Sequence, residues 1–130
     1  MIHWSEEYTI GVETIDAQHQ QLFEIANRIY DLLKNKLILD KYDGIIEIIN
    51  ELKDYTIYHF KEEEAYMESI HYKKFFSQKI AHDDFLAKMD TIDVEKIDNG
   101  QNVYLLEILD FVCDWLVHHI IEEDKLIVSK

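Results

Sequence analysis

The spacing of apolar residues along this chain restricts its fold more than any other feature. Four stretches carry apolar residues at alternating steps of three and four, which is the period of a helix that buries one face. The first of these stretches runs through Leu22, Ala26, Ile29 and Leu33. Because proline is absent and only three glycines occur in 130 residues, little interrupts these patterns, and long helices are expected.

Four helices with short connections predict an all-α fold, an up-down-up-down four-helix bundle, in a single domain that spans residues 1–130. Asp16 is the predicted N-cap of the first helix, and residues 90–101 are predicted to form a loop. An extended N-terminal arm over residues 1–15 is expected to precede the helices, which are predicted at about residues 17–36, 41–66, 72–89 and 102–127.

Charge and composition narrow the range of partners. Twenty-seven acidic residues stand against 13 basic ones and give a net charge of −14, so nucleic acids and anionic membrane surfaces are not expected to bind.

No apolar run approaches the ~20 residues of a membrane span and no signal peptide is visible, so a cytoplasmic protein is expected. Cys113, the single cysteine, lies in an apolar run and is expected to be a small buried or half-buried side chain.

Several polar residues occupy positions in the apolar stripes where a core residue is expected. A buried polar group is costly unless something binds it, and a metal binds imidazole and carboxylate groups together. In an up-down bundle these positions all fall near one end, so residues far apart in the sequence are expected to meet in one layer of the core. The residues are His19, His59, Glu63, Gln78, His82 and His119.

The types of donor group narrow the choice of metal. Three or four imidazoles with two carboxylates exceed the needs of one tetrahedral zinc ion, whereas carboxylates from facing helices suit a pair of iron or manganese ions. Histidine as the majority donor favours iron. A single cysteine excludes an iron–sulfur cluster. The stripes therefore predict a buried site for two metal ions, with iron the favoured element.

The carboxylate that accompanies His119 is ambiguous on geometry alone. Glu123 follows His119 by four residues and lies on the same face of an ideal helix. Asp124 follows by five residues and is about 140° out of register, so it would reach the site from the flank of the helix or through a π-type bulge. The spacing leaves both residues open as ligands.

Three segments give the chain a specific resemblance to a known family. Residues 11–19 read GVETIDAQH, residues 59–63 read HFKEE, and residues 115–119 read WLVHH and lead on to Asp124. In this order, and over nearly the whole chain, the segments resemble the hemerythrin family in its bacterial single-domain form. Because the family pattern ends in His-x4-Asp, the resemblance favours Asp124 over Glu123.

By this resemblance, the chain is expected to hold two iron ions joined by an oxo or hydroxo bridge in a four-helix bundle. The resemblance implies that His19 and His59 bind one iron. It implies that His82 and His119 bind the other. The first iron would keep an open position, and dioxygen would bind there.

The resemblance also implies how the two irons are linked and what surrounds the oxygen. The carboxylates of Glu63 and Asp124 would bridge the irons. An apolar pocket would cover the open position. The side chains that line it could pack in the core at the same time. The residues that match the pocket are Leu22, Phe60, Trp115, Leu116 and Ile120.

The chain departs from the family pattern at Gln78, because the pattern places a histidine four residues before His82. The Gln78 amide oxygen could bind the second iron weakly, or the amide could hydrogen-bond a water in the vacated position. In both cases the second iron loses a strong nitrogen donor. Both irons are then expected to accept exogenous ligands, with less stable oxygen binding and faster oxidation.

The expected function is an oxygen-binding protein for storage, delivery or sensing, rather than an enzyme. An apolar pocket without an evident proton-relay acid or base favours this function. One alternative is a di-iron enzyme of the oxidase or peroxidase type. Another is a structural bundle with a degenerate metal site. Gln78 raises the weight of both alternatives.

Overall fold

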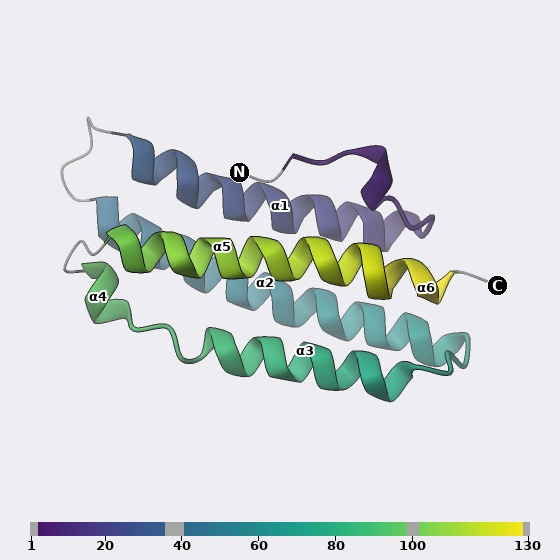
Figure 1. Cartoon of the computed structure of the whole chain (residues 1–130). Coiled ribbons are helices and arrows are strands. Elements are labelled where there is room, and N and C mark those ends of the chain that lie inside the picture. The colour runs from purple at the N-terminus through teal and green to yellow at the C-terminus, as the bar shows by residue number, and fades with distance from the viewer. Residues whose placement is uncertain (1–2, 36–40, 99–101, 129–130) are drawn as a thin grey trace.

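The computed structural model describes residues 3–35, 41–98 and 102–128, and all the regular secondary structure in them is helical. The four long helices lie side by side and alternate in direction (Figure 1), which confirms the prediction of an all-α up-down-up-down bundle. They are α1 (Glu13–Lys34), α2 (Lys41–Ser69), α3 (Phe75–Met89) and α5 (Asn102–His118). The short elements are a 3-10 turn η1 (Glu6–Tyr8), α4 (Val94–Asp98), a π-helical segment η2 (His119–Asp124) and α6 (Lys125–Ile127).

Helix α1 begins at Glu13, which is earlier than predicted, and Asp16 is not its N-cap. Asp16 lies inside the first turn, and its carboxylate accepts hydrogen bonds from the backbone N–H groups of Ile10 at 2.9 Å and Gly11 at 3.1 Å. These donors belong to the arm, so Asp16 ties the arm to the helix instead of satisfying the helix's own free N–H groups.

Gly11 has a φ of 98°, a left-handed conformation that glycine adopts without strain. The predicted helix end at residue 36 lies outside the described residues.

The N-terminal arm packs on α1 through aromatic rings. Trp4 and Tyr8 both contact the buried Phe23, with ring centroids 5.5 and 5.2 Å away. Tyr8 is the last residue of the η1 turn, so the arm is not extended throughout as predicted. These contacts hold the arm along the outside of the bundle beside α1 (Figure 1).

The connection predicted as a loop over residues 90–101 contains a short helix, α4. The side chain of Asp93 accepts a hydrogen bond from the backbone N–H of Glu95 at 3.0 Å, which caps the start of this helix. Ile97 on α4 is fully buried. The burial of one apolar side chain therefore gives the connection a helical turn, which the turn-forming residues of the segment did not predict.

The connection between α2 and α3 lies later in the chain than predicted. Helix α2 continues to Ser69, and α3 begins at Phe75. Between them His71 has a φ of 54°, a left-handed conformation that reverses the chain. The two helices are therefore antiparallel neighbours, and the end of α2 lies beside the start of α3 (Figure 1).

The apolar core extends along the middle of the bundle and closes the end where α4 lies. Ile29 of α1, Ile45 of α2 and Leu105 of α5 are fully buried, and Ile97 of α4 belongs to the same cluster of buried apolar side chains. Across the described residues, no helix combines the length and the apolar character needed to span a membrane. Toward the other end, where α1 begins and α2 finishes, the interior becomes polar.

Candidate metal centre

The polar interior of the bundle is made by seven side chains, each more than nine-tenths buried. They come from α1, α2 and α3 and from η2, which directly follows α5, and their donor atoms lie close together near one end of the bundle. Residues that are far apart in the sequence therefore share one layer, as the three-four spacing predicts. The seven are His19, His59, Glu63, Gln78, His82, His119 and Asp124.

Glu63 joins two histidine groups through its two carboxylate oxygens. Its Oε2 atom lies 3.4 Å from the Nε2 atom of His19 and 3.3 Å from that of His59. Its Oε1 atom lies 3.1 Å from the Nε2 atom of His82. One oxygen faces the first pair of imidazoles, and the other oxygen faces the opposite group.

Asp124 joins the same two groups from the other side. Its Oδ2 atom lies 3.2 Å from the Nε2 atom of His19, and its Oδ1 atom lies 3.3 Å from the Nε2 atom of His119. The Nε2 atoms of His82 and His119 are 3.2 Å apart and face each other. Two clusters of donor atoms result, each spanning less than 4.8 Å, with Glu63 common to both. Two carboxylates shared between two histidine pairs form a cage for two adjacent cations.

Several atoms of this cage have unused hydrogen-bonding capacity. Among the described residues, none provides a hydrogen-bond partner of good geometry for either ring nitrogen of His19 or for either oxygen of Glu63. The Oε1 atom of Gln78 is in the same state. Leaving such atoms buried and unpaired costs about 1–3 kcal/mol each. Bound cations would satisfy them, and nitrogen and carboxylate oxygen are the donors that non-haem iron prefers. The residues therefore fit a pair of irons.

The position of Asp124 depends on a local change in the helix. Residues His119–Asp124 form a π-helix, in which backbone hydrogen bonds join residues five apart. Five residues then make about one turn, so Asp124 returns to the face that carries His119. Glu123 is only half-buried and belongs to neither donor cluster. The structure thus favours Asp124 over Glu123, through the π-type bulge that the spacing left open.

Two polar side chains orient the imidazoles. The Nδ1 atom of His59 is 2.7 Å from the amide oxygen of Gln18, and the Nδ1 atom of His82 is 2.8 Å from a carboxylate oxygen of Glu64. Both oxygens accept hydrogen bonds, so each Nδ1 carries the proton and each Nε2 keeps a lone pair that faces the cage. Sequence reasoning missed Gln18 and Glu64. The sequence pattern that could have pointed to them is their position, because Gln18 directly precedes His19 and Glu64 directly follows Glu63.

The ionisable groups of the cage shift one another's pKa values. Burial lowers the pKa of the His59 imidazole, which favours its neutral form. Burial acts in the same direction on His19, but the carboxylates of Asp124 and Glu63 outweigh it and raise the pKa of His19 to about 9. Burial would raise the pKa of Glu63, but the neighbouring histidines hold it well below its usual range. A metal binds the unprotonated imidazole, so the carboxylates that raise the pKa of His19 make metal binding there depend on pH.

Aromatic rings cover one side of the cage. Phe60 stacks on His82 with ring centroids 3.8 Å apart, and Trp115 stacks on His119 at 4.3 Å. Both rings therefore contact the second histidine pair. The other residues predicted to line an oxygen pocket, Leu22, Leu116 and Ile120, are buried. Their lining of such a pocket stays a prediction.

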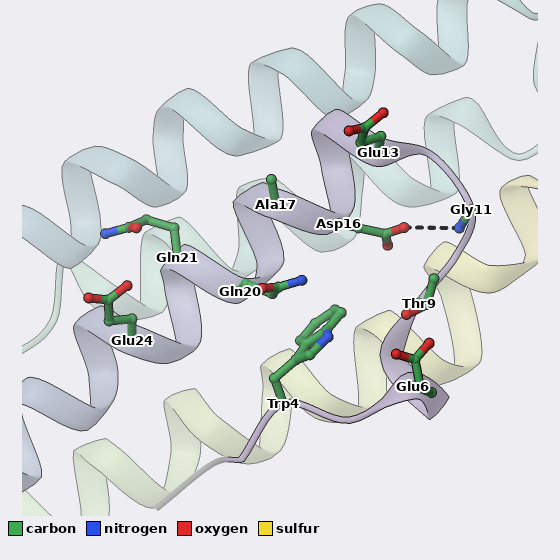
Figure 2. Close-up of a pocket in the computed structure, with 10 residues that line it drawn as sticks. All are labelled: Trp4, Glu6, Thr9, Gly11, Glu13, Asp16, Ala17, Gln20, Gln21 and Glu24. Carbon is green, nitrogen blue, oxygen red and sulfur yellow. Dashed lines mark hydrogen bonds between the residues drawn. The ribbon is translucent and has the colours of Figure 1, made fainter.

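The remaining polar features at the surface lack this organisation. A hollow of about 520 Å³ lies between the N-terminal arm and α1, beside Trp4 (Figure 2). The exposed carboxylates of Glu6, Glu13 and Glu24 surround it, and no histidine is among the described residues that line it. His118, the neighbour of His119, is exposed and lies 3.7 Å from Glu122. The buried cage is therefore the stronger candidate for a functional site.

Known proteins of similar sequence and structure identify the family. The sequence model of the Hemerythrin HHE cation binding domain matches residues 10–130. The bacteriohemerythrin of Clostridium acetobutylicum is 48% identical over 125 residues, which cover 96% of this chain and 97% of that protein. The bacteriohemerythrin of Pseudomonas aeruginosa is 31% identical over 121 residues, which cover 93% of this chain and 75% of that protein. A crystal structure of wild-type hemerythrin matches with a TM-score of 0.80 at 29% identity and covers 97% of this chain and 94% of its own. The chain belongs to the hemerythrin family.

Proposed function

We propose that this hemerythrin binds dioxygen reversibly with two iron ions held in the buried cage. The observation that carries the proposal is the pair of carboxylates, Glu63 and Asp124, each of which faces both histidine groups through separate oxygens. When bound, the two irons would supply the reversible redox chemistry by which this family takes up dioxygen. The protein supplies the geometry and the dry surroundings.

We propose the following roles for the cage residues. His19 and His59 hold the first iron, and His82 and His119 hold the second. The donor atoms form two clusters, and each cluster contains one of these histidine pairs, which supports this division. Gln18 and Glu64 fix the rings of His59 and His82, so these imidazoles are preorganised before metal arrives.

The apolar side chains around the cage keep water away from the bound ligand. Phe60 and Leu116 are buried, and Trp115 covers His119. A site from which water is excluded loses protons and electrons to solvent slowly, which favours release of dioxygen unchanged. These side chains offer no acid or base to the ligand, which supports a carrier or sensor rather than an enzyme.

We also propose that dioxygen is the physiological ligand and that the protein acts in the cytoplasm. The acidic surface supports the absence of nucleic acid and anionic lipid partners, because a net charge of −14 repels both. Dioxygen needs no charged recognition site, so an enclosed site with apolar side chains around it suits this ligand.

Metal analysis combined with visible spectra tests the proposed function. Protein loaded anaerobically with ferrous iron should hold iron at both histidine groups, develop visible bands in air and lose them under vacuum. The variant Glu63→Ala should take up little iron and show no bands. Bands that disappear irreversibly while peroxide and a reductant are consumed would favour the oxidase or peroxidase alternative. Protein that takes up no iron would contradict the proposal.

A further inference from the structure

Gln78 contacts the cage with the end of its side chain that cannot bind a metal. It lies on α3 four residues before His82, so both side chains are on the same helix face. Its amide Nε2 atom donates a hydrogen bond to the Oδ1 atom of Asp124 at 3.2 Å. That same oxygen lies 3.3 Å from His119, so the Gln78 amide lies beside the second histidine pair.

The chemistry of the contact fixes the orientation of the amide. The reverse orientation would place the amide oxygen of Gln78 against a carboxylate oxygen of Asp124, and two acceptors repel each other. In the observed orientation the N–H end faces the cage, and an amide nitrogen has no lone pair to give to a metal. The Gln78 side chain is only 1% exposed, so solvent does not reach its Oε1 atom, and this atom has no hydrogen-bond partner among the described residues.

The second histidine pair therefore receives no third strong donor from α3. The donor atoms gathered there belong to His82, His119, Glu63 and Asp124. The first histidine pair has the same number of donor residues, because its two imidazoles face the same two carboxylates. Two histidines and carboxylate oxygens around a non-haem iron leave open positions.

We infer that the second metal has its own exchangeable position beside Gln78, so that a small exogenous ligand, an anion such as azide or a diatomic gas, binds at each of the two metals. This inference rests on the proposed function, because it requires iron at both histidine pairs. Gln78 acts as a positioning residue. Its N–H group holds the Oδ1 atom of Asp124 beside the second histidine pair.

The two histidines of the second pair differ in exposure. His119 is 7% exposed, whereas His19 and His82 are fully enclosed. Trp115, which stacks on His119, is half-buried and borders solvent. His119 is therefore the most exposed of the four cage histidines.

Azide titration of the diferric full-length protein tests the inference. Isothermal titration calorimetry should give roughly two azide equivalents per chain, because each iron has an open position. The variant Gln78→His restores an imidazole four residues before His82 and should reduce the number to roughly one. The variant Gln78→Ala removes the amide without adding a donor and should keep roughly two equivalents, with weaker binding of the second. Iron content is measured on every sample.

The outcomes separate this inference from the proposed function. Two irons with a single azide in the unchanged protein would overturn the inference and leave the proposed function standing. A rise from one azide to two in Gln78→Ala would show that Gln78 itself binds iron through its oxygen, which also overturns it. Protein without iron would overturn both proposals. If Gln78→His fails to fold, the titration of the unchanged protein still decides.

Discussion

The two ends of this bundle have opposite interiors. At the end where α1 begins and α2 finishes, the interior holds imidazole and carboxylate groups whose buried atoms are incompletely paired. At the other end Ile45, Ile97 and Leu105 are apolar and fully enclosed. Packing alone closes the apolar end, whereas the polar end requires bound cations to offset the cost of its buried groups. One fold therefore divides its interior between stability and ligand binding.

Removal of the shared carboxylate should have the largest effect on the polar end. Glu63 faces both histidine pairs, so Glu63→Ala should reduce the iron content at both positions together rather than at one. Metal analysis after anaerobic loading measures this. The matched control is Glu62→Ala, which removes an exposed carboxylate from the same helix and should leave the iron content unchanged. Retention of one iron in Glu63→Ala would argue against a shared ligand.

Removal of the metal should destabilise the protein through the polar end alone. Structural metal sites couple binding to folding, so a chelator should lower the free energy of unfolding by about 3 kcal/mol or more, or roughly 10 °C in Tm. Thermal unfolding followed by circular dichroism measures the shift. Glu63→Ala should show almost no further loss with the chelator, because it has little metal to lose. An equal chelator effect in both proteins would mean that the metal stabilises some other site.

A cavity at the apolar end should lower stability without disturbing the metal. Leu105 is fully buried on α5, so Leu105→Ala should cost about 3 kcal/mol of unfolding free energy. Its iron content and visible spectrum should match those of the unchanged protein. Loss of iron in this variant would show that the two ends are coupled rather than independent.

Loss of a charged orienting group should weaken the second histidine pair more than the first. Glu64→Gln keeps a hydrogen-bond acceptor for His82 but removes its charge, so iron affinity should fall by about 10-fold. His59 already has the neutral amide of Gln18 as its partner, which provides the internal comparison. Competition with a calibrated chelator measures the two affinities. Equal weakening of both irons would contradict the separate support of the two rings.

Cys113, in the apolar part of α5, should be unreactive in the folded protein. Burial raises the pKa of its thiol to about 11, so the nucleophilic thiolate is scarce at pH 8. Alkylation by iodoacetamide should therefore be slow when the protein is folded and fast in urea, and the folded rate should rise only as the pH approaches 11. Mass spectrometry measures the modified fraction. Rapid alkylation at pH 8 without urea would show that this region opens.

Most of the bundle could be predicted from the sequence, because each long helix carries a continuous three-four stripe. The same stripes placed His19, His59 and His82 in the core, since polar residues in phase with apolar ones have nowhere else to lie. The apolar run around Cys113 predicted a buried or half-buried side chain, and the structure shows it buried. In these cases the local pattern alone determines which way the side chain faces.

The rest depends on features that side-chain spacing does not encode. The choice between Glu123 and Asp124 follows from the π-helix, which changes backbone hydrogen bonding without a distinctive residue pattern. Helix α4 has only five residues, too few to show a period, and Ile97 holds it in place through tertiary burial. Gln18 and Glu64 lie beside the stripes, so only the packed helices show which ring each one contacts.

Anomalous diffraction at the iron absorption edge, from crystals of anaerobically loaded protein, tests the central claim most directly. Two shared carboxylates between two histidine pairs predict two separate iron peaks. One peak should lie beside His19 and His59 and the other beside His82 and His119, with Glu63 and Asp124 between them. A single peak, or peaks away from these side chains, would contradict the claim that the buried cage holds two irons.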